Sequence, residues 1–80
     1  MTQQDVLQQV QQVIREELDN DDVAVTPETV ADDIEDWDSL TNIQIMMALQ
    51  KKFGVKFTAL QINGFKNVGE ICNCILSTKA

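Results

Sequence analysis

The chain has 80 residues, of which 44% are hydrophobic and 24% charged, and its formal net charge is −7. This length allows one domain with a small core, so we expect a single domain over residues 1–80. The absence of histidine excludes the usual general base, the commonest metal ligand and every Ser-His-Asp triad. Two cysteines cannot complete a zinc site without histidine, so no metal centre is expected.

The charge is distributed unevenly along the chain. Residues 1–50 hold twelve acids and one base, a net charge of −11, whereas residues 51–80 hold one acid and five lysines, a net charge of +4. Eleven of the thirteen acids lie within residues 16–38, with no base among them. Such a cluster repels nucleic acids and anionic membranes, so neither is expected as a partner. It favours partner proteins that carry a basic patch.

The chain has no segment that predicts export or membrane insertion. The longest apolar run is Ile45–Leu49, far shorter than a membrane span, and no signal peptide opens the sequence. Cys72 and Cys74 lie two residues apart, a spacing that points their side chains in different directions on a helix. Free thiols suit a reducing compartment. We therefore expect a cytoplasmic monomer, with Cys72 in the core and Cys74 at its rim.

Residues 3–18 are predicted to form an amphipathic helix. Thr2 and Asp5 provide an N-terminal cap. Apolar residues then recur at helical spacing at positions 6, 7, 10, 13, 14 and 18. Residues 19–37 interrupt this period with acids and Pro27, which indicates a long ordered loop. Four scattered apolar side chains are expected to hold that loop on the core: Val23, Val25, Val30 and Ile34.

A second helix is predicted to begin at Asp38 or Ser39 and to end at Gly54. Its core-facing stripe is predicted to contain Leu40, Ile43, Met46 or Met47, and Phe53. Residues 58–65 are expected to form a short turn of helix, and Asn67 with Glu70 to cap a last helix that ends near residue 77. The predicted order is helix, long loop, helix, short helix and helix, so the predicted fold class is all-α.

The segment Glu35–Leu40 contains the residue that we consider the main functional candidate, Ser39. A hydroxyl at a helix N-terminus faces unpaired backbone N–H groups, which stabilise the negative charge of a phosphoryl group. Alternatively, Ser39 only caps the helix. Capping preferences alone favour this second interpretation.

Asp38, Ser39 and Leu40, placed after a long acidic loop, resemble the attachment motif of acyl carrier proteins. Residues 48–57 resemble the end of that family's second helix, and residues 67–71 the start of its last helix. The resemblance implies a small antiparallel helical bundle of three main helices and one short helix. The resemblance implies that a phosphopantetheinyl transferase attaches 4′-phosphopantetheine to Ser39, with Asp38 and Leu40 as the flanking motif residues. The thiol of this arm would carry acyl intermediates between enzymes of fatty-acid, polyketide or related biosynthesis, and the chain itself would not be an enzyme.

Two departures from the family pattern affect the expected partners. Many members have glycine three residues before the serine, where this chain has Asp36, and this substitution resembles free-standing carriers of specialised pathways. Residues 41–53 contain no acid, although the family usually docks partners through acids on this helix. The docking charge is therefore expected from residues ahead of the helix, and the apolar contacts from the helix and the loop. The expected docking residues are Asp32, Asp33, Glu35, Asp36, Trp37, Ile43 and Met46.

Several alternatives remain open from the sequence. Trp37 either covers the core or contacts a partner. The cargo is either an acyl or an aminoacyl group, and the alternative to a carrier is an unmodified acidic interaction domain of the same fold. A hydrolase is excluded by the absence of histidine. The acidic run 19–22 lacks the ligand spacing of an EF-hand loop.

Overall fold

The computed structural model describes residues 2–79, and the regular secondary structure in that range is entirely helical. Its elements are α1 (Gln3–Leu18), the 3₁₀ helix η1 (Ala31–Asp33), α2 (Ser39–Phe53), α3 (Ala59–Gly64) and α4 (Val68–Lys79). No β-strand occurs among residues 2–79, so the all-α prediction is confirmed. The sequence analysis missed η1 and ended α4 two to three residues too early. Within the described range, no helix is both long and apolar enough to cross a membrane.

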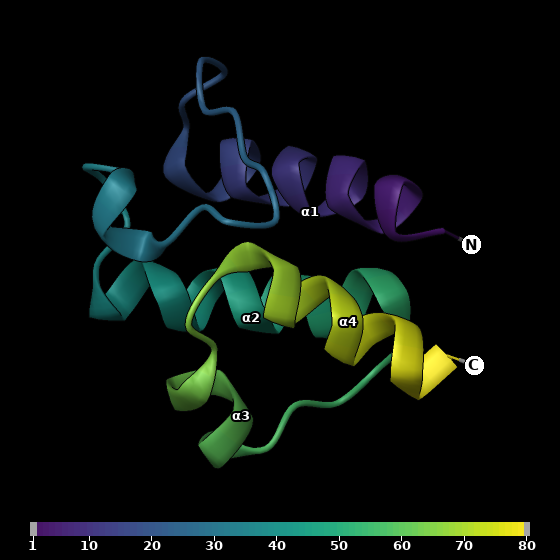
Figure 1. Cartoon of the computed structure of the whole chain (residues 1–80). Helices are drawn as coiled ribbons and strands as arrows, with labels where there is room; N and C mark the ends of the chain where they lie inside the picture. Colours follow the sequence, from purple (N-terminus) through teal and green to yellow (C-terminus); the bar gives the residue numbers. More distant parts are fainter. Residues whose placement is uncertain (1, 80) are drawn as a thin grey trace.

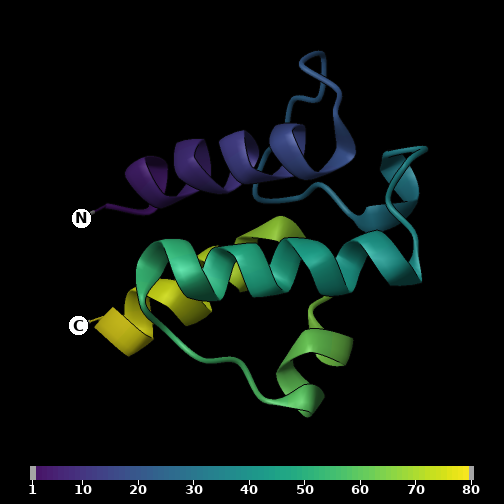
Figure 2. The ribbon, with the colours of Figure 1, turned by 180° about the vertical axis from the view of Figure 1, so that it is seen from behind.

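The three long helices surround one core. Helix α1 contacts both α2 and α4. It runs in the direction opposite to α2 and α4, which run the same way as each other (Figures 1 and 2). The short α3 lies on the other side of α2 and α4 from α1 (Figure 1). This arrangement brings the C-terminal end of α1, the long loop and the N-terminal end of α2 to one end of the molecule.

Helix α1 forms as its sequence predicts. The Thr2 hydroxyl accepts a hydrogen bond from the Asp5 amide at 3.2 Å, and the Asp5 carboxylate accepts one from the Thr2 amide at 3.1 Å. These hydrogen bonds hold the pKa of Asp5 below its usual value. The apolar stripe faces the core through Val6, Leu7, Val10, Val13 and Ile14.

Helix α2 buries a different face from the one predicted. Its buried residues are Ile45, Met46, Leu49 and Phe53. Leu40 and Ile43, which the sequence assigned to the core stripe, are 65% and 50% exposed, and that assignment was wrong. Residues 45–49 are apolar on more than one face, so helical spacing alone allows two stripes. Packing against α1 and α4 selects the stripe that includes Ile45 and Leu49.

The long loop between α1 and α2 is held by hydrogen bonds as well as by buried valines. Val23 and Val25 are buried. Arg15 Nε donates to the Val23 carbonyl at 2.6 Å, and the Gln11 side chain accepts from the Val25 amide at 2.9 Å. The loop is thus fixed against α1, although a segment without regular structure has no hydrogen-bond ladder of its own.

The same loop completes the N-terminus of α4. The amides of Val68 and Gly69 donate to the carbonyls of Thr29 and Pro27, each at 2.8 Å. The Asn67 side chain accepts from the Glu70 amide at 2.9 Å, which confirms Asn67 as a cap. Backbone N–H groups that a helix start leaves unpaired are therefore satisfied.

The side chains of α4 and α3 close the other side of the core. Ile71, Cys72 and Ile75 are buried, and burial raises the pKa of the Cys72 thiol to about 11. Cys72 therefore stays a neutral thiol near neutral pH. The rings of Phe57 and Phe65 meet edge to face at 5.5 Å, which joins the link before α3 to the link after it.

We predict that Gly69→Ala destabilises the protein. A Cβ at this position would lie 2.8 Å from the Pro27 carbonyl oxygen, a backbone atom that also accepts a hydrogen bond. Such overpacking typically costs about 1–3 kcal/mol. Gly64→Ala is the matched control, since a Cβ there meets nothing within 4 Å. Urea denaturation should give a lower midpoint for Gly69→Ala alone, and equal midpoints for the two variants would contradict the role of this contact.

Candidate functional site

The candidate site is the N-terminus of α2, where Asp38 caps the helix. Asp38 Oδ1 accepts from the Thr41 amide at 2.9 Å, and the Thr41 hydroxyl accepts from the Asp38 amide at 2.8 Å. This is a reciprocal capping box in which Thr41 takes the place that glutamate or glutamine often fills. The Thr41 hydroxyl in turn donates to the Asp36 carbonyl at 3.1 Å, which fixes the last residues of the loop.

Ser39 is the first residue of α2 and its side chain is exposed. Among the described residues, the Ser39 hydroxyl has no hydrogen-bond partner, because the capping position is taken by Asp38. The sequence left open whether Ser39 only caps the helix. In the structure the capping role belongs to Asp38 instead. Leu40 follows on the exposed side of the helix. The hydroxyl of Ser39 is available to react without any change in the cap.

The hydrogen bonds of the cap lower the pKa of Asp38. The largest cause is the hydrogen bond from the Thr41 backbone amide. A carboxylate with a lowered pKa is a weaker base and is already used as an acceptor. Asp38 is therefore poorly suited to take the proton of Ser39, and the chain has no histidine to do so. The local chemistry provides a nucleophile without its own base.

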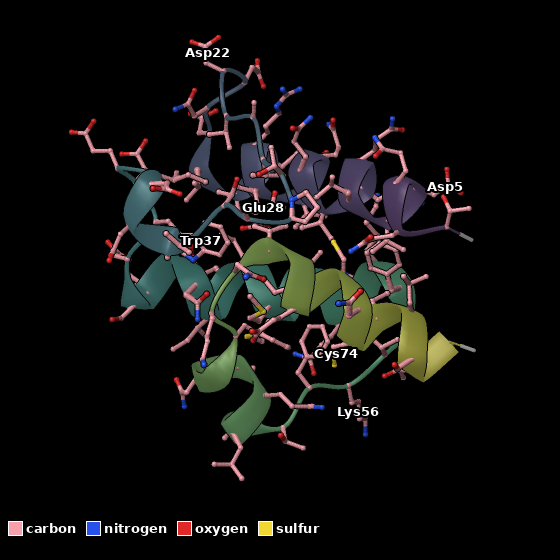
Figure 3. All side chains as sticks on the ribbon, viewed as in Figure 1. Asp5, Asp22, Glu28, Trp37, Lys56 and Cys74 are labelled. Atoms are coloured by element: carbon pink, nitrogen blue, oxygen red, sulfur yellow. The ribbon has the colours of Figure 1, made fainter. Side chains whose placement is uncertain are left out.

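Trp37 closes the core beside the site. Its side chain is 8% exposed, and its indole Nε1 donates to the Asn42 side chain at 2.9 Å. The ring lies at the junction of the loop and α2 (Figure 3). The sequence left two roles open for Trp37, covering the core or contacting a partner. The structure shows that Trp37 covers the core. Sequence analysis missed Asn42, although a buried tryptophan N–H usually needs an acceptor and Asn42 is the polar residue one turn into the next helix.

A groove lies next to Ser39 between η1, the start of α2 and α3. Its volume is about 310 Å³. Its lining includes Ser39, Trp37, Asn42, Ile62, Asn63 and Phe65. The lining combines side-chain amides and apolar surface with the carboxylates of Asp32 and Asp38, and its amides and apolar groups suit an arm built from amides and methylene groups. The free hydroxyl at its edge and the mixed lining fit a phosphopantetheine group on Ser39.

Five of the seven residues expected to dock partners are exposed, and they differ in what their side chains contact. Asp32, Glu35 and Asp36 are exposed, and their side chains make no hydrogen bond among the described residues. Asp33 is exposed but its carboxylate accepts from the Val30 amide at 3.1 Å, which stabilises η1. Ile43 is half exposed.

Met46 and Trp37 are placed differently from what docking requires. Met46 is fully buried, and Trp37 is nearly so. Neither side chain is available at the surface of this structure, because the stripe of α2 that packs on α1 and α4 contains Met46 and the loop presses Trp37 onto the core.

Over the described residues, no group of three or more histidine, cysteine or acidic side chains is placed to hold a metal ion.

The lowered pKa of Asp38 predicts a pH-dependent stability. Since the folded-state pKa lies below the ordinary value of 3.8, ionised Asp38 stabilises the fold fully above that value. This stabilisation is lost as pH falls through the lower, folded-state pKa. Urea denaturation at about pH 7 and about pH 2 would compare the wild type with Asp38→Asn and Asp38→Ala.

Asparagine keeps the capping acceptor but removes the charge, whereas alanine removes both. At neutral pH the wild type should be the most stable and Asp38→Ala the least. At the acidic pH the advantage of the wild type over Asp38→Asn should shrink, because Asp38 becomes protonated as pH falls through its folded-state pKa. A wild-type advantage over Asp38→Asn of the same size at both pH values would contradict the role of the charge.

Comparisons with known proteins agree with this geometry. Residues 8–75 match the family model described as phosphopantetheine attachment site. The acyl carrier protein of Helicobacter pylori strain 26695 is 38% identical over 76 residues, which cover 92% of this chain and 95% of that protein. The acyl carrier protein of Thermosynechococcus vestitus is 30% identical over 76 residues, covering 94% and 93%.

A solved structure is similar over nearly the whole fold. The solution NMR structure of holo acyl carrier protein from Geobacter metallireducens superposes with a TM-score of 0.86 at 28% identity, covering 92% of this chain and 85% of that one. The chain therefore belongs to the phosphopantetheine attachment-site family and functions as an acyl carrier protein, a carrier of 4′-phosphopantetheine and not an enzyme.

Proposed function

We propose that Ser39 is the residue to which 4′-phosphopantetheine is attached, with Asp38 and Leu40 as its flanking motif. The observation that carries this proposal is the exposed Ser39 hydroxyl at the N-terminus of α2, left without a hydrogen bond because Asp38 caps the helix. When bound, the group supplies a thiol that holds acyl cargo as a thioester.

The chain's own contribution to the attachment is a positioned nucleophile. Ser39 Oγ forms a bond to the phosphorus of coenzyme A that carries the pantetheine, and the nucleotide half of coenzyme A leaves. The transferase must accept the proton of Ser39, because Asp38 is committed to the cap. The positive end of the α2 dipole stabilises the resulting phosphate charge.

Family membership gives phosphopantetheinyl transferase and biosynthetic enzymes as partners. In this proposal they dock on the exposed carboxylates of Asp32, Asp33, Glu35 and Asp36 and on Ile43. The proposal omits Met46 and Trp37 as direct contacts because both are buried. A basic patch on the partner would meet these acids, and charge attraction of this kind mainly accelerates association.

The acid-free α2 and the Asp36–Trp37 pair support a role in a specialised pathway of acyl metabolism. We further propose a single-domain, cytoplasmic monomer. Cys72 and Cys74 are both free thiols, which suits a reducing compartment.

Replacement of Ser39 by alanine should abolish modification. The purified protein would be incubated with coenzyme A, magnesium and a broad-specificity phosphopantetheinyl transferase, and its intact mass measured. The wild type should gain one phosphopantetheine and Ser39→Ala none, with unchanged helix content. Ser77→Ala is the matched control, since Ser77 is the only other serine. Modification of Ser39→Ala, or an unmodified wild type beside a modified control carrier, would overturn the assignment.

Reversal of the acids near Ser39 should slow modification. Asp32→Lys/Asp36→Lys is expected to lower kcat/KM for the transferase by roughly tenfold at low salt, with a smaller effect at high salt. Asp21→Lys/Glu28→Lys changes the net charge equally in other parts of the loop, and it should have a much smaller effect. Equal losses in the two double variants would show that net charge rather than the proposed surface governs docking.

A further inference from the structure

The outer face of α2 carries most of the large hydrophobic side chains that the described structure exposes. Leu40, Ile43 and Met47 are 65%, 50% and 62% exposed, and they recur at spacings of three and four residues. They therefore form one stripe along the helix, which begins beside Ser39. In Figure 2 α2 lies in front of α4, and no other helix of the described residues is drawn in front of it. We call these three residues the outer stripe.

The two ends of the outer stripe carry opposite charges. At the Ser39 end lie the exposed acids Asp32 and Asp36, which precede the helix. At the other end lie Lys51 and Lys52 in the last turn of α2, both exposed. Lys51 follows Met47 by four residues, so it continues the outer stripe. It lines a shallow groove together with Gln44, Met47, Ala48 and Glu17 of α1, so one acid borders the lysine end of the stripe.

These charges are free to meet a partner. No ion pair involves Lys51 or Lys52 among the described side chains, and Asp32 and Asp36 make no side-chain hydrogen bond there. A helix rises 1.5 Å per residue, so Lys51 lies about 18 Å along the axis from Ser39. A standard interface covers about 800 Å² of each partner, a patch roughly 16 Å in radius, so one partner centred on the outer stripe reaches both ends.

Resting on the function proposed above, we infer that the phosphopantetheinyl transferase of the source organism docks along the whole outer face of α2 through a surface of divided charge. Basic side chains of the transferase meet the acids at the Ser39 end, an apolar strip meets the outer stripe, and acidic side chains meet Lys51 and Lys52. A uniformly basic partner is disfavoured, because it would place like charges against the two lysines.

The sign of one charge reversal tests this inference. The source organism's transferase would modify the wild type and Lys51→Glu/Lys52→Glu with coenzyme A, and kcat/KM would be measured across a range of salt concentrations. Divided charge predicts a loss of roughly fivefold at low salt that shrinks as salt screens the charges. A uniformly basic transferase surface predicts a gain instead. A gain, or no change, would overturn the inference.

Two further variants separate docking from folding. The Lys51→Gln/Lys52→Gln variant opposes the dipole of α2 less strongly than Lys51→Glu/Lys52→Glu does. Its kcat/KM should also fall, but by a smaller factor. Lys56→Glu/Lys66→Glu changes the net charge equally outside α2 and should change kcat/KM little; Lys56 lies on the link below α4 in Figure 3. Equal losses in this control would overturn the inference.

Failure of the proposed function is distinguishable from failure of this inference, because the wild type itself would then gain no phosphopantetheine mass.

A second copy of the chain is the other possible occupant of the outer stripe. Sedimentation of the wild type would reveal a dimer, and a dimer that the Lys51→Glu/Lys52→Glu variant abolishes would assign these charges to self-association and overturn the inference.

Discussion

The reciprocal hydrogen bonds between Asp38 and Thr41 determine the geometry of the functional end of the molecule. They place the cap of α2 one residue before Ser39, so Ser39 is the first residue of the helix and its hydroxyl is unused. The same Thr41 hydroxyl holds the Asp36 carbonyl, which positions the loop beside it. Had Ser39 been the cap, its oxygen would be engaged by a backbone N–H, and modification would require the helix to fray.

The long loop has a structural role as well as an electrostatic one. Its carbonyls at Pro27 and Thr29 accept from the first amides of α4, and Trp37 covers the core where the loop joins α2. These contacts fix a segment dense in acids, which would otherwise separate through mutual repulsion. Carboxylates at its far end are thereby held next to Ser39, while α2 presents apolar side chains and lysines.

Signals close together in the sequence predicted most of the fold. Thr2 with Asp5 defined the start of α1, and Gly54 defined the end of α2 through its left-handed backbone. The buried face of α2 was not predictable in this way, because residues 45–49 are apolar on several sides and contacts with α1 and α4 make the choice. The close approach of Gly69 to Pro27 was likewise beyond local patterns. At the site, Asp38 and Ser39 were equal candidates for the cap, although Thr41 three residues after Asp38 was a usable signal.

The central claim is that Ser39 becomes modified while Asp38 keeps the cap of α2. Amide NMR spectra of the protein before and after loading with phosphopantetheine test it directly. The account predicts large changes at Ser39 and its neighbours, a Thr41 amide that stays protected from hydrogen exchange, and unchanged amides in α1 and α4. Loss of protection at Thr41 upon loading, or a hydrogen bond from Thr41 or Asn42 to the Ser39 oxygen before loading, would contradict it.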